Sequence, residues 1–144
     1  MVAHSIGGLI AAKAILASPT IGDRLDGLLM ISVPLSGFRP AGLIGFLSPW
    51  VRGLTIGAGH IEEIRRTWLK RFGDHPPFAI KTVFGEKESL VRIEHLPGSS
   101  LTFIPDATHS SVLRSDVELA EIIRAMIADR PRYSSNGRPS DTRP

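Results

Sequence analysis

The sequence MVAHSIGGLIAAKAILA (residues 1–17) decides how the chain should fold. Ser5 lies among small residues, and a helical pattern rich in Ala and Leu follows it over residues 7–17. A serine in this setting belongs either to an ordinary Gly-rich turn or to a sharp strand-to-helix turn that exposes its hydroxyl. Such a sharp turn tolerates only small residues two positions before and after the serine, and Ala3 and Gly7 meet this requirement.

Short apolar runs that alternate with helical patterns indicate the fold class. A helix is predicted over residues 61–72, and a capping box at Ser115 and Glu118 predicts the start of a last helix. Together with strands between these helices, this order predicts an α/β fold whose mostly parallel sheet is flanked by helices. The predicted strands are DGLLMISV (26–33), FAIKTVF (78–84) and LTFI (101–104).

The composition bounds the class of protein. With 144 residues, 42% apolar and 22% charged, the chain is typical of one soluble globular domain. It has no cysteine, which excludes disulfides and cysteine metal sites, and His60, His75 and His95 lack metal-ligand spacing. The net charge is only +3 and no basic stripe is interleaved with aromatic residues, so we expect no nucleic-acid partner.

The hydropathy pattern bears on location. No apolar run approaches the ~20 residues that a membrane span needs. The start of the chain also lacks the basic and then apolar layout of a secretory signal. We therefore predict no transmembrane segment and a cytoplasmic location.

Three residues with catalytic chemistry stand next to the predicted strands, in the order serine, acid, histidine. Ser5 directly precedes a helix, Glu88 follows the second complete strand and His109 follows the last strand. Active groups collect at the carboxyl ends of strands in α/β sheets. A serine hydroxyl needs an imidazole to accept its proton, and the imidazole needs a carboxylate to fix its tautomer and stabilise its charged form.

Four segments resemble the α/β-hydrolase superfamily. Residues 3–8 (AHSIGG) resemble its nucleophile elbow, especially in lipase-like members with a His-Ser-x-Gly-Gly core, although Ala3 stands where Gly is commonest. The resemblance covers roughly residues 2–128. The later segments resemble the strand and loop after the elbow helix (ISVPLSG, 31–37), the acid loop (VFGEKESLV, 83–91) and the histidine loop (DATHSSVL, 106–113).

This resemblance implies a serine hydrolase of the lipase or esterase type, acting on a small-molecule or lipid ester. Ser5 would be the nucleophile, His109 the base and Glu88 the acid that orients it. The backbone N–H of Ile6, at the start of the helix, would supply half of an oxyanion hole. No metal or cofactor is implied, and the sequence does not predict an oligomeric state.

Other residues compete for these roles. Glu86 is the nearest competitor of Glu88, and the register with the family pattern favours Glu88. Asp106 precedes His109 by only three residues, which favours a role in the loop. We interpret His4 as a packing residue beside the turn.

The resemblance also predicts the domain organisation. Members of the family have strands and helices before the elbow, so residues 1–129 are interpreted as the C-terminal part of an α/β-hydrolase domain whose N-terminal strands are missing. Residues 130–144 are polar and Pro-rich, which predicts a disordered tail. The alternative to an enzyme is a non-catalytic hydrolase remnant or an interaction module.

The Gly-rich apolar connection over residues 36–60 is predicted to form the acyl-side wall or lid of the site. Phe46, Leu47 and Trp50 would line an acyl pocket there, or else pack in the core or an ordinary loop.

Overall fold

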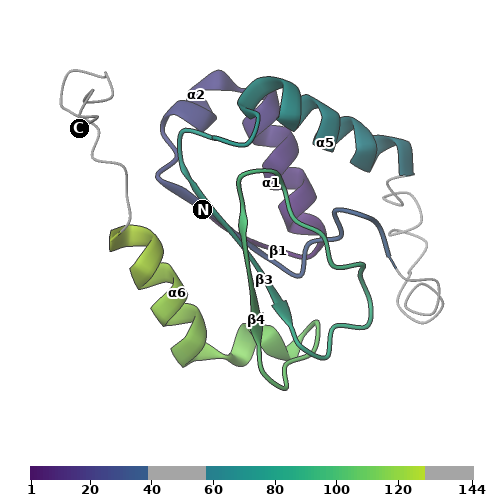
Figure 1. Cartoon of the computed structure of the whole chain (residues 1–144), viewed down its shortest axis with the longest axis vertical. Coiled ribbons are helices and arrows are strands. Elements are labelled where there is room, and N and C mark those ends of the chain that lie inside the picture. The colour runs from purple at the N-terminus through teal and green to yellow at the C-terminus, as the bar shows by residue number, and fades with distance from the viewer. Residues whose placement is uncertain (39–57, 129–144) are drawn as a thin grey trace.

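The computed structural model describes residues 1–38 and 58–128. Within these ranges one sheet of four parallel strands has the order β1-β2-β3-β4 (Figure 1). The prediction of a mostly parallel α/β sheet is confirmed. The strands are β1 (Val2–His4), β2 (Gly27–Ile31), β3 (Ala79–Gly85) and β4 (Ser100–Ile104).

Helices cover both faces of this sheet (Figure 1). They are α1 (Ile6–Ala17), α2 (Pro19–Asp23), α5 (Ala58–Phe72), the 3₁₀ helix η1 (Ser111–Arg114) and α6 (Asp116–Ala128). In chain order, α1 and α2 lie between β1 and β2, α5 lies between β2 and β3, and η1 and α6 follow β4, so helices connect β1 to β2 and β2 to β3, as parallel strands require.

Two of these helices were not predicted from the sequence. In the sequence, the pair Ser18-Pro19 indicates only the end of the first helix, yet in the structure Pro19 also begins α2. Proline has no N–H to donate, and the first residue of a helix needs none, so the same proline ends α1 and starts α2. The other short segment, η1, is a single turn and is too short to show an apolar repeat from which it could be predicted.

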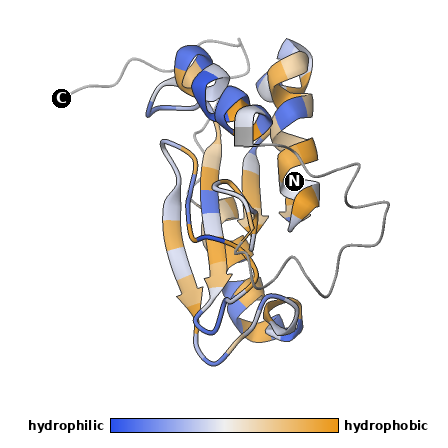
Figure 2. Cartoon of the chain, turned by 90° about the vertical axis from the view of Figure 1, so that its right-hand side faces the viewer, coloured by the Kyte–Doolittle hydropathy of each residue, from blue (hydrophilic) through white to orange (hydrophobic). Residues whose placement is uncertain are grey.

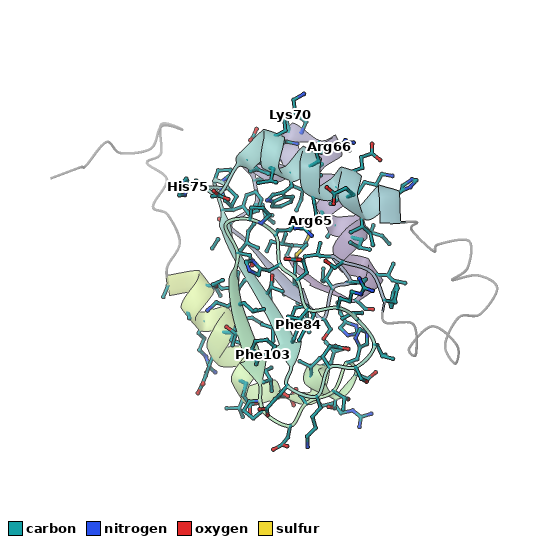
Figure 3. All side chains as sticks on the ribbon, turned by 45° about the vertical axis from the view of Figure 1, so that its right-hand side comes forward. Arg65, Arg66, Lys70, His75, Phe84 and Phe103 are labelled. Atoms are coloured by element: carbon teal, nitrogen blue, oxygen red, sulfur yellow. The ribbon has the colours of Figure 1, made fainter. Side chains whose placement is uncertain are left out.

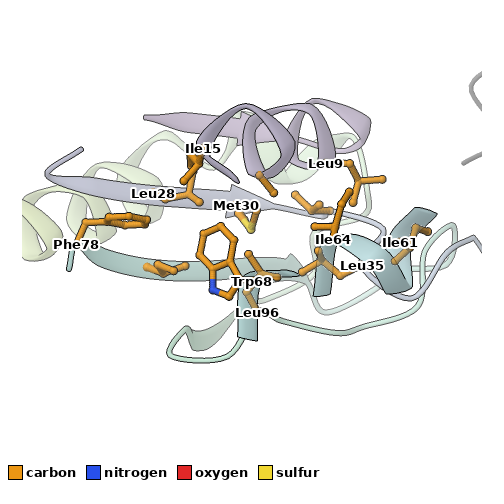
Figure 4. Close-up of a cluster of buried hydrophobic side chains, with 13 residues drawn as sticks. Leu9, Ile15, Leu28, Met30, Leu35, Ile61, Ile64, Trp68, Phe78 and Leu96 are labelled. Atoms are coloured by element: carbon orange, nitrogen blue, oxygen red, sulfur yellow. The ribbon is translucent and has the colours of Figure 1, made fainter. Parts of the chain in front are cut away.

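The larger part of the core lies between the sheet and the pair α1 and α5 (Figure 4). Trp68 of α5 is fully buried there, and its ring lies 4.9 Å from that of Phe72 and 6.1 Å from that of Phe78. Burying apolar surface is the main favourable term in folding, so this layer is the main source of stability. Its buried members are Leu9, Ala12, Ile15, Leu28, Met30, Val33, Leu35, Ile61, Ile64, Trp68, Phe78, Ile80 and Leu96.

The amphipathic pattern of α5 matches its position at the surface. Arg66 and Lys70 are exposed and point away from the sheet (Figure 3), whereas Trp68 is fully buried in the core (Figure 4). Phe84 and Phe103 lie on neighbouring strands on the sheet below, with ring centroids 6.5 Å apart. The charged face is therefore a solvated helix face of the usual kind.

The opposite face of the sheet carries a smaller core beneath α6. The strands contribute alternate apolar residues to it, and Figure 2 shows that the strands are largely hydrophobic along their length. No residue of α6 is fully buried; Leu119, Ile122, Ile123 and Met126 pack against the cluster while half-exposed. The six buried members are Leu29, Ile31, Val83, Ile104, Ala107 and Val112.

Parallel pairing brings the carboxyl ends of β1, β3 and β4 to one edge of the sheet. The segments after these three strands carry Ser5, Glu88 and His109. In the described part of the chain, no helix combines the length and apolar character needed to cross a membrane. Phe46, Leu47, Trp50 and most of the predicted 36–60 connection lie outside the described residues, as does the predicted tail over residues 130–144.

Candidate active site

Ser5 occupies the sharp turn between β1 and α1. Its backbone has φ 52° and ψ −131°, a conformation that L-residues rarely adopt. The turn is held on both sides, because the Ser5 N–H donates to the Ile31 carbonyl at 2.9 Å and its carbonyl accepts from the Gly8 N–H at 3.0 Å. Surrounding hydrogen bonds therefore hold the serine in a strained geometry that presents its side chain above the sheet edge.

The space around this turn is tightest at a different glycine from the one that the sequence pattern indicates. A Cβ on Gly7, two positions after Ser5, would meet no described atom within 4 Å. A Cβ on Gly8 would overlap the side chain of Val33, which is fully buried after β2. Of the two glycines after Ser5, Gly8 is therefore the one that must lack a side chain, because α1 approaches the segment after β2 at this position.

His109 lies between the other two predicted site residues. Its Nε2 is 3.0 Å from Ser5 Oγ, and its Nδ1 is 3.0 Å from Glu88 Oε2. The His109 side chain is 11% exposed and the Glu88 side chain is fully buried. The structure thus brings Ser5, His109 and Glu88 into one hydrogen-bonded row that joins the ends of three strands.

The Glu88 carboxylate is stabilised from several directions. Burial alone would raise its pKa, but hydrogen bonds from His109 and from the Leu90 N–H, with the nearby Ser32 hydroxyl, hold the pKa at about 2. Oε1 accepts from the backbone N–H groups of Leu90 at 2.9 Å and Val91 at 3.3 Å, which leaves Oε2 for His109. Glu88 is therefore ionised at neutral pH and faces the imidazole.

A close backbone approach holds the acid loop against the histidine loop. Gly85 ends β3, and a Cβ there would clash with the backbone carbonyl of Ala107. The Lys87 N–H donates to the same carbonyl at 2.8 Å. Because this contact is between backbone groups, a glycine at position 85 sets the spacing of the two loops.

The two competing acids point elsewhere. Glu86 is exposed and accepts the Asp106 N–H at 3.3 Å. Asp106 has φ 56° and forms a 2.6 Å ion pair with Lys87, and this pairing lowers the pKa of the Asp106 carboxyl. Both acids thus bind other parts of the loops, whereas Glu88 is the acid that contacts His109.

Ile6 is the first residue of α1, directly behind Ser5. The N–H groups of a first helical turn have no partner inside the helix and point outward from its N-terminus. The helix dipole adds positive potential at the same place. This is where an anionic oxygen beside Ser5 would be favoured.

Two further polar residues of the site were not predicted to have this position. His4 was interpreted as a packing residue, but its Nε2 lies 3.1 Å from the carbonyl oxygen of His109. Ser32 is fully buried with φ 47°, and its hydroxyl makes no hydrogen bond of ordinary geometry. His4 directly precedes Ser5 and Ser32 directly follows β2, but neither place in the sequence indicates these contacts.

The remaining histidines and acids do not form a metal centre in the part of the chain that is described. Residues 1–38 and 58–128 contain no group of three or more His, Cys, Asp or Glu side chains that could hold a metal ion. His60 and His75 are exposed and His95 is half-buried.

The parallel sheet flanked by helices, with a strained serine turn between β1 and α1, has the arrangement of part of an α/β-hydrolase fold. Solved structures support this assignment of the fold. One is a thermophilic esterase with a TM-score of 0.55 and 21% identity, covering 88% of this chain and 64% of its own. Another is a thioesterase domain from the curacin biosynthetic pathway, with a TM-score of 0.51 and 12% identity, covering 85% of this chain and 65% of its own.

The chain thus spans slightly less than two thirds of the length of either structure. At these identities the likeness is one of fold. No protein-family model matches the sequence, and no curated protein matches it.

Proposed function

We propose that this chain is a serine hydrolase that cleaves carboxylic-ester bonds through Ser5, His109 and Glu88. The observation that carries the proposal is the continuous row from Ser5 Oγ through both nitrogens of His109 to Glu88, with a distance of 3.0 Å at each step. It begins at a strained serine in front of a helix, where a nucleophile of this class is presented.

In the first half of the reaction, Ser5 Oγ attacks the ester carbonyl carbon while His109 Nε2 takes the hydroxyl proton. The carbonyl π pair moves onto oxygen, and the Ile6 N–H donates a hydrogen bond to the oxyanion. Glu88 accepts the Nδ1–H and stabilises the imidazolium. When the tetrahedral adduct collapses, Nε2 returns its proton to the leaving alkoxide, and an acyl ester of Ser5 remains.

In the second half, water takes the place of the alcohol. His109 Nε2 removes a proton from water as its oxygen attacks the acyl carbon. Collapse of this adduct releases the carboxylic acid and returns the proton to Ser5 Oγ. Each step uses groups of this chain and water, with no metal or cofactor.

The proposed substrate class is based on the type of bond that the three residues can cleave, and not on the shape of a binding pocket. An activated ester, a lipid acyl ester and a thioester all present a carbonyl to the same nucleophile. The two structural neighbours are an esterase and a thioesterase domain, which agrees with acyl transfer to water as the shared chemistry. We propose a small-molecule or lipid ester as the substrate.

The experiment compares the chain with two serine variants. A fluorophosphonate probe should label the wild-type chain at Ser5, and Ser5→Ala should abolish both labelling and hydrolysis of a short-chain aryl ester. Ser100→Ala is the matched control, because Ser100 is exposed at the opposite end of β4. Undiminished labelling of Ser5→Ala would rule out the assigned nucleophile.

The second candidate is a non-catalytic module with the same fold. Its support is that the chain spans less than two thirds of both neighbours. Within residues 1–38 and 58–128, the oxyanion donor of the proposed mechanism is the Ile6 N–H alone. A cooperatively folded wild-type chain that neither reacts with the probe nor turns over an ester would favour this candidate over the enzyme.

A further inference from the structure

We infer that His4 is a positioning residue that fixes the loop carrying His109, an inference that rests on the proposed function. His4 Nε2 lies 3.1 Å from the backbone carbonyl oxygen of His109. The two imidazole rings are also in contact, with centroids 5.1 Å apart and planes at 50°. The residue next to the nucleophile in sequence thus binds the residue that would activate it.

The strand order gives this contact its importance. His4 is the last residue of β1, and His109 follows β4, with β2 and β3 between them in the sheet. Backbone pairing therefore fixes β1 relative to β4 only through two intervening strands. The His4 contact and the Ser5–His109 contact cross this distance directly, at the edge where the reaction would occur.

The direction of the hydrogen bond follows from its acceptor. A backbone carbonyl only accepts, so His4 Nε2 carries the proton and donates it. His4 holds the main chain of His109, whereas Glu88 holds its ring through Nδ1. The two contacts are complementary, because a ring fixed at Nδ1 on a mobile main chain can still drift from Ser5 Oγ.

This position separates His4 from an ordinary packing residue. It is half-buried and its backbone pairs with Ile31 in the sheet, which any residue at this position could do. The imidazole adds a donor aimed at the histidine loop. Loss of that donor should therefore affect the alignment of His109 more than the folding of β1.

The test uses three variants of the full chain with an aryl ester. His4→Phe keeps the ring and removes the donor, and His4→Gln keeps an N–H donor at a similar reach. We expect His4→Phe to lower kcat roughly threefold to tenfold at unchanged KM, the equivalent of one ordinary hydrogen bond, and His4→Gln to restore most of it. His95→Phe is the matched control: His95 Nδ1 lies 3.2 Å from the Leu96 carbonyl, outside the catalytic row, so kcat should stay unchanged.

Two kinetic results would overturn the inference. The first is wild-type kcat in a folded His4→Phe variant, since the donor would then be dispensable. The second is a His4→Gln variant as slow as His4→Phe, which would assign the effect to the ring contact. If thermal unfolding shows that His4→Phe is not folded, the comparison of His4→Gln with a smaller His4→Ala variant decides in the same way.

A measurement without turnover separates this inference from the proposed function. Nitrogen-15 NMR of the imidazoles reports which ring nitrogen carries the proton and whether each nitrogen is hydrogen-bonded. We expect His109 to keep its Nδ1–H tautomer in both proteins, because Glu88 still holds Nδ1, and its Nε2 signal to shift in His4→Phe as the contact with Ser5 Oγ loosens. Absence of probe labelling in the wild type would overturn the hydrolase proposal, whereas identical His109 Nε2 signals in both proteins would overturn the role of His4.

Discussion

Two glutamates in the same loop, Glu86 and Glu88, have the same side chain and opposite environments. Glu88 is 5% exposed and accepts hydrogen bonds from two backbone N–H groups and from His109. Glu86 is exposed and accepts a hydrogen bond from the Asp106 N–H. The exposure and the hydrogen bonds of a carboxylate in this loop therefore depend on its position after β3.

Backbone hydrogen bonds in this loop turn the two glutamates in different directions. The Glu86 N–H donates to the Ile104 carbonyl at 2.9 Å, which extends the pairing of β3 and β4 by one residue, and the Glu88 N–H donates to the Gly85 carbonyl at 3.1 Å. The chain turns between these two bonds. As a result Glu86 still follows the strand, whereas Glu88 is turned inward toward His109.

The largest effect is expected when the inner carboxylate loses its charge. Glu88→Gln keeps the shape of the side chain but cannot hold His109 as the required tautomer, and an amide in this role lowers kcat by about 10⁴-fold in triads. We expect a fall of at least about 10³-fold in aryl-ester turnover. A loss below tenfold, in a variant that melts cooperatively, would remove Glu88 from the proposed mechanism.

The second effect concerns acid stability, where the two glutamates should again differ. The pKa of Glu88 is lowered from 4.5 to about 2, so its ionised form stabilises the folded state above pH 4.5. That stabilisation is lost as the pH falls from about 4.5 to about 2. The free energy of unfolding of the wild type should thus exceed that of Glu88→Gln at pH 6, by about 1.5–3 kcal/mol for hydrogen bonds to a charged group.

Denaturant unfolding at pH 6 and pH 3 measures this difference. The difference in unfolding free energy between wild type and Glu88→Gln should narrow at pH 3, because Glu88 then binds a proton in the unfolded chain, which favours unfolding, while it stays largely ionised in the folded chain. A gap that stays constant between the two pH values would mean that Glu88 has an ordinary pKa in the folded chain.

Much of the fold was predictable because its elements are marked by apolar periodicity. The three complete strands were predicted within a few residues of their observed ends, and the helix around Trp68 lies where its pattern indicated. Such patterns persist because each element must bury one face. The helix α2 and the turn η1 were missed, since neither is long enough to show a period.

The site was predictable in part, for a different reason. The order of Ser5, Glu88 and His109 and their places after strands can be read from a sequence, and the structure brings the three together. The roles of these residues remain predictions. The position of His4 could not be predicted, because its contact joins the two outer strands of the sheet and depends on twist and loop course. Ser32 was likewise hidden, since only the folded chain shows its φ of 47° beside the acid loop.

The smallest effect is expected when the outer glutamate, Glu86, is replaced. This substitution is the direct control for Glu88→Gln. Glu86→Gln is the same chemical change as Glu88→Gln, two residues away, in a side chain that faces solvent. Its amide oxygen can still accept the Asp106 N–H, and the Lys87–Asp106 ion pair also holds this loop. Exposed charges contribute little to stability, so turnover should stay within about twofold and the free energy of unfolding within about 0.5 kcal/mol of wild type. Parallel ester assays on the two variants check this; if Glu86→Gln lost activity and Glu88→Gln kept it, the acid of the row would be assigned to the wrong glutamate.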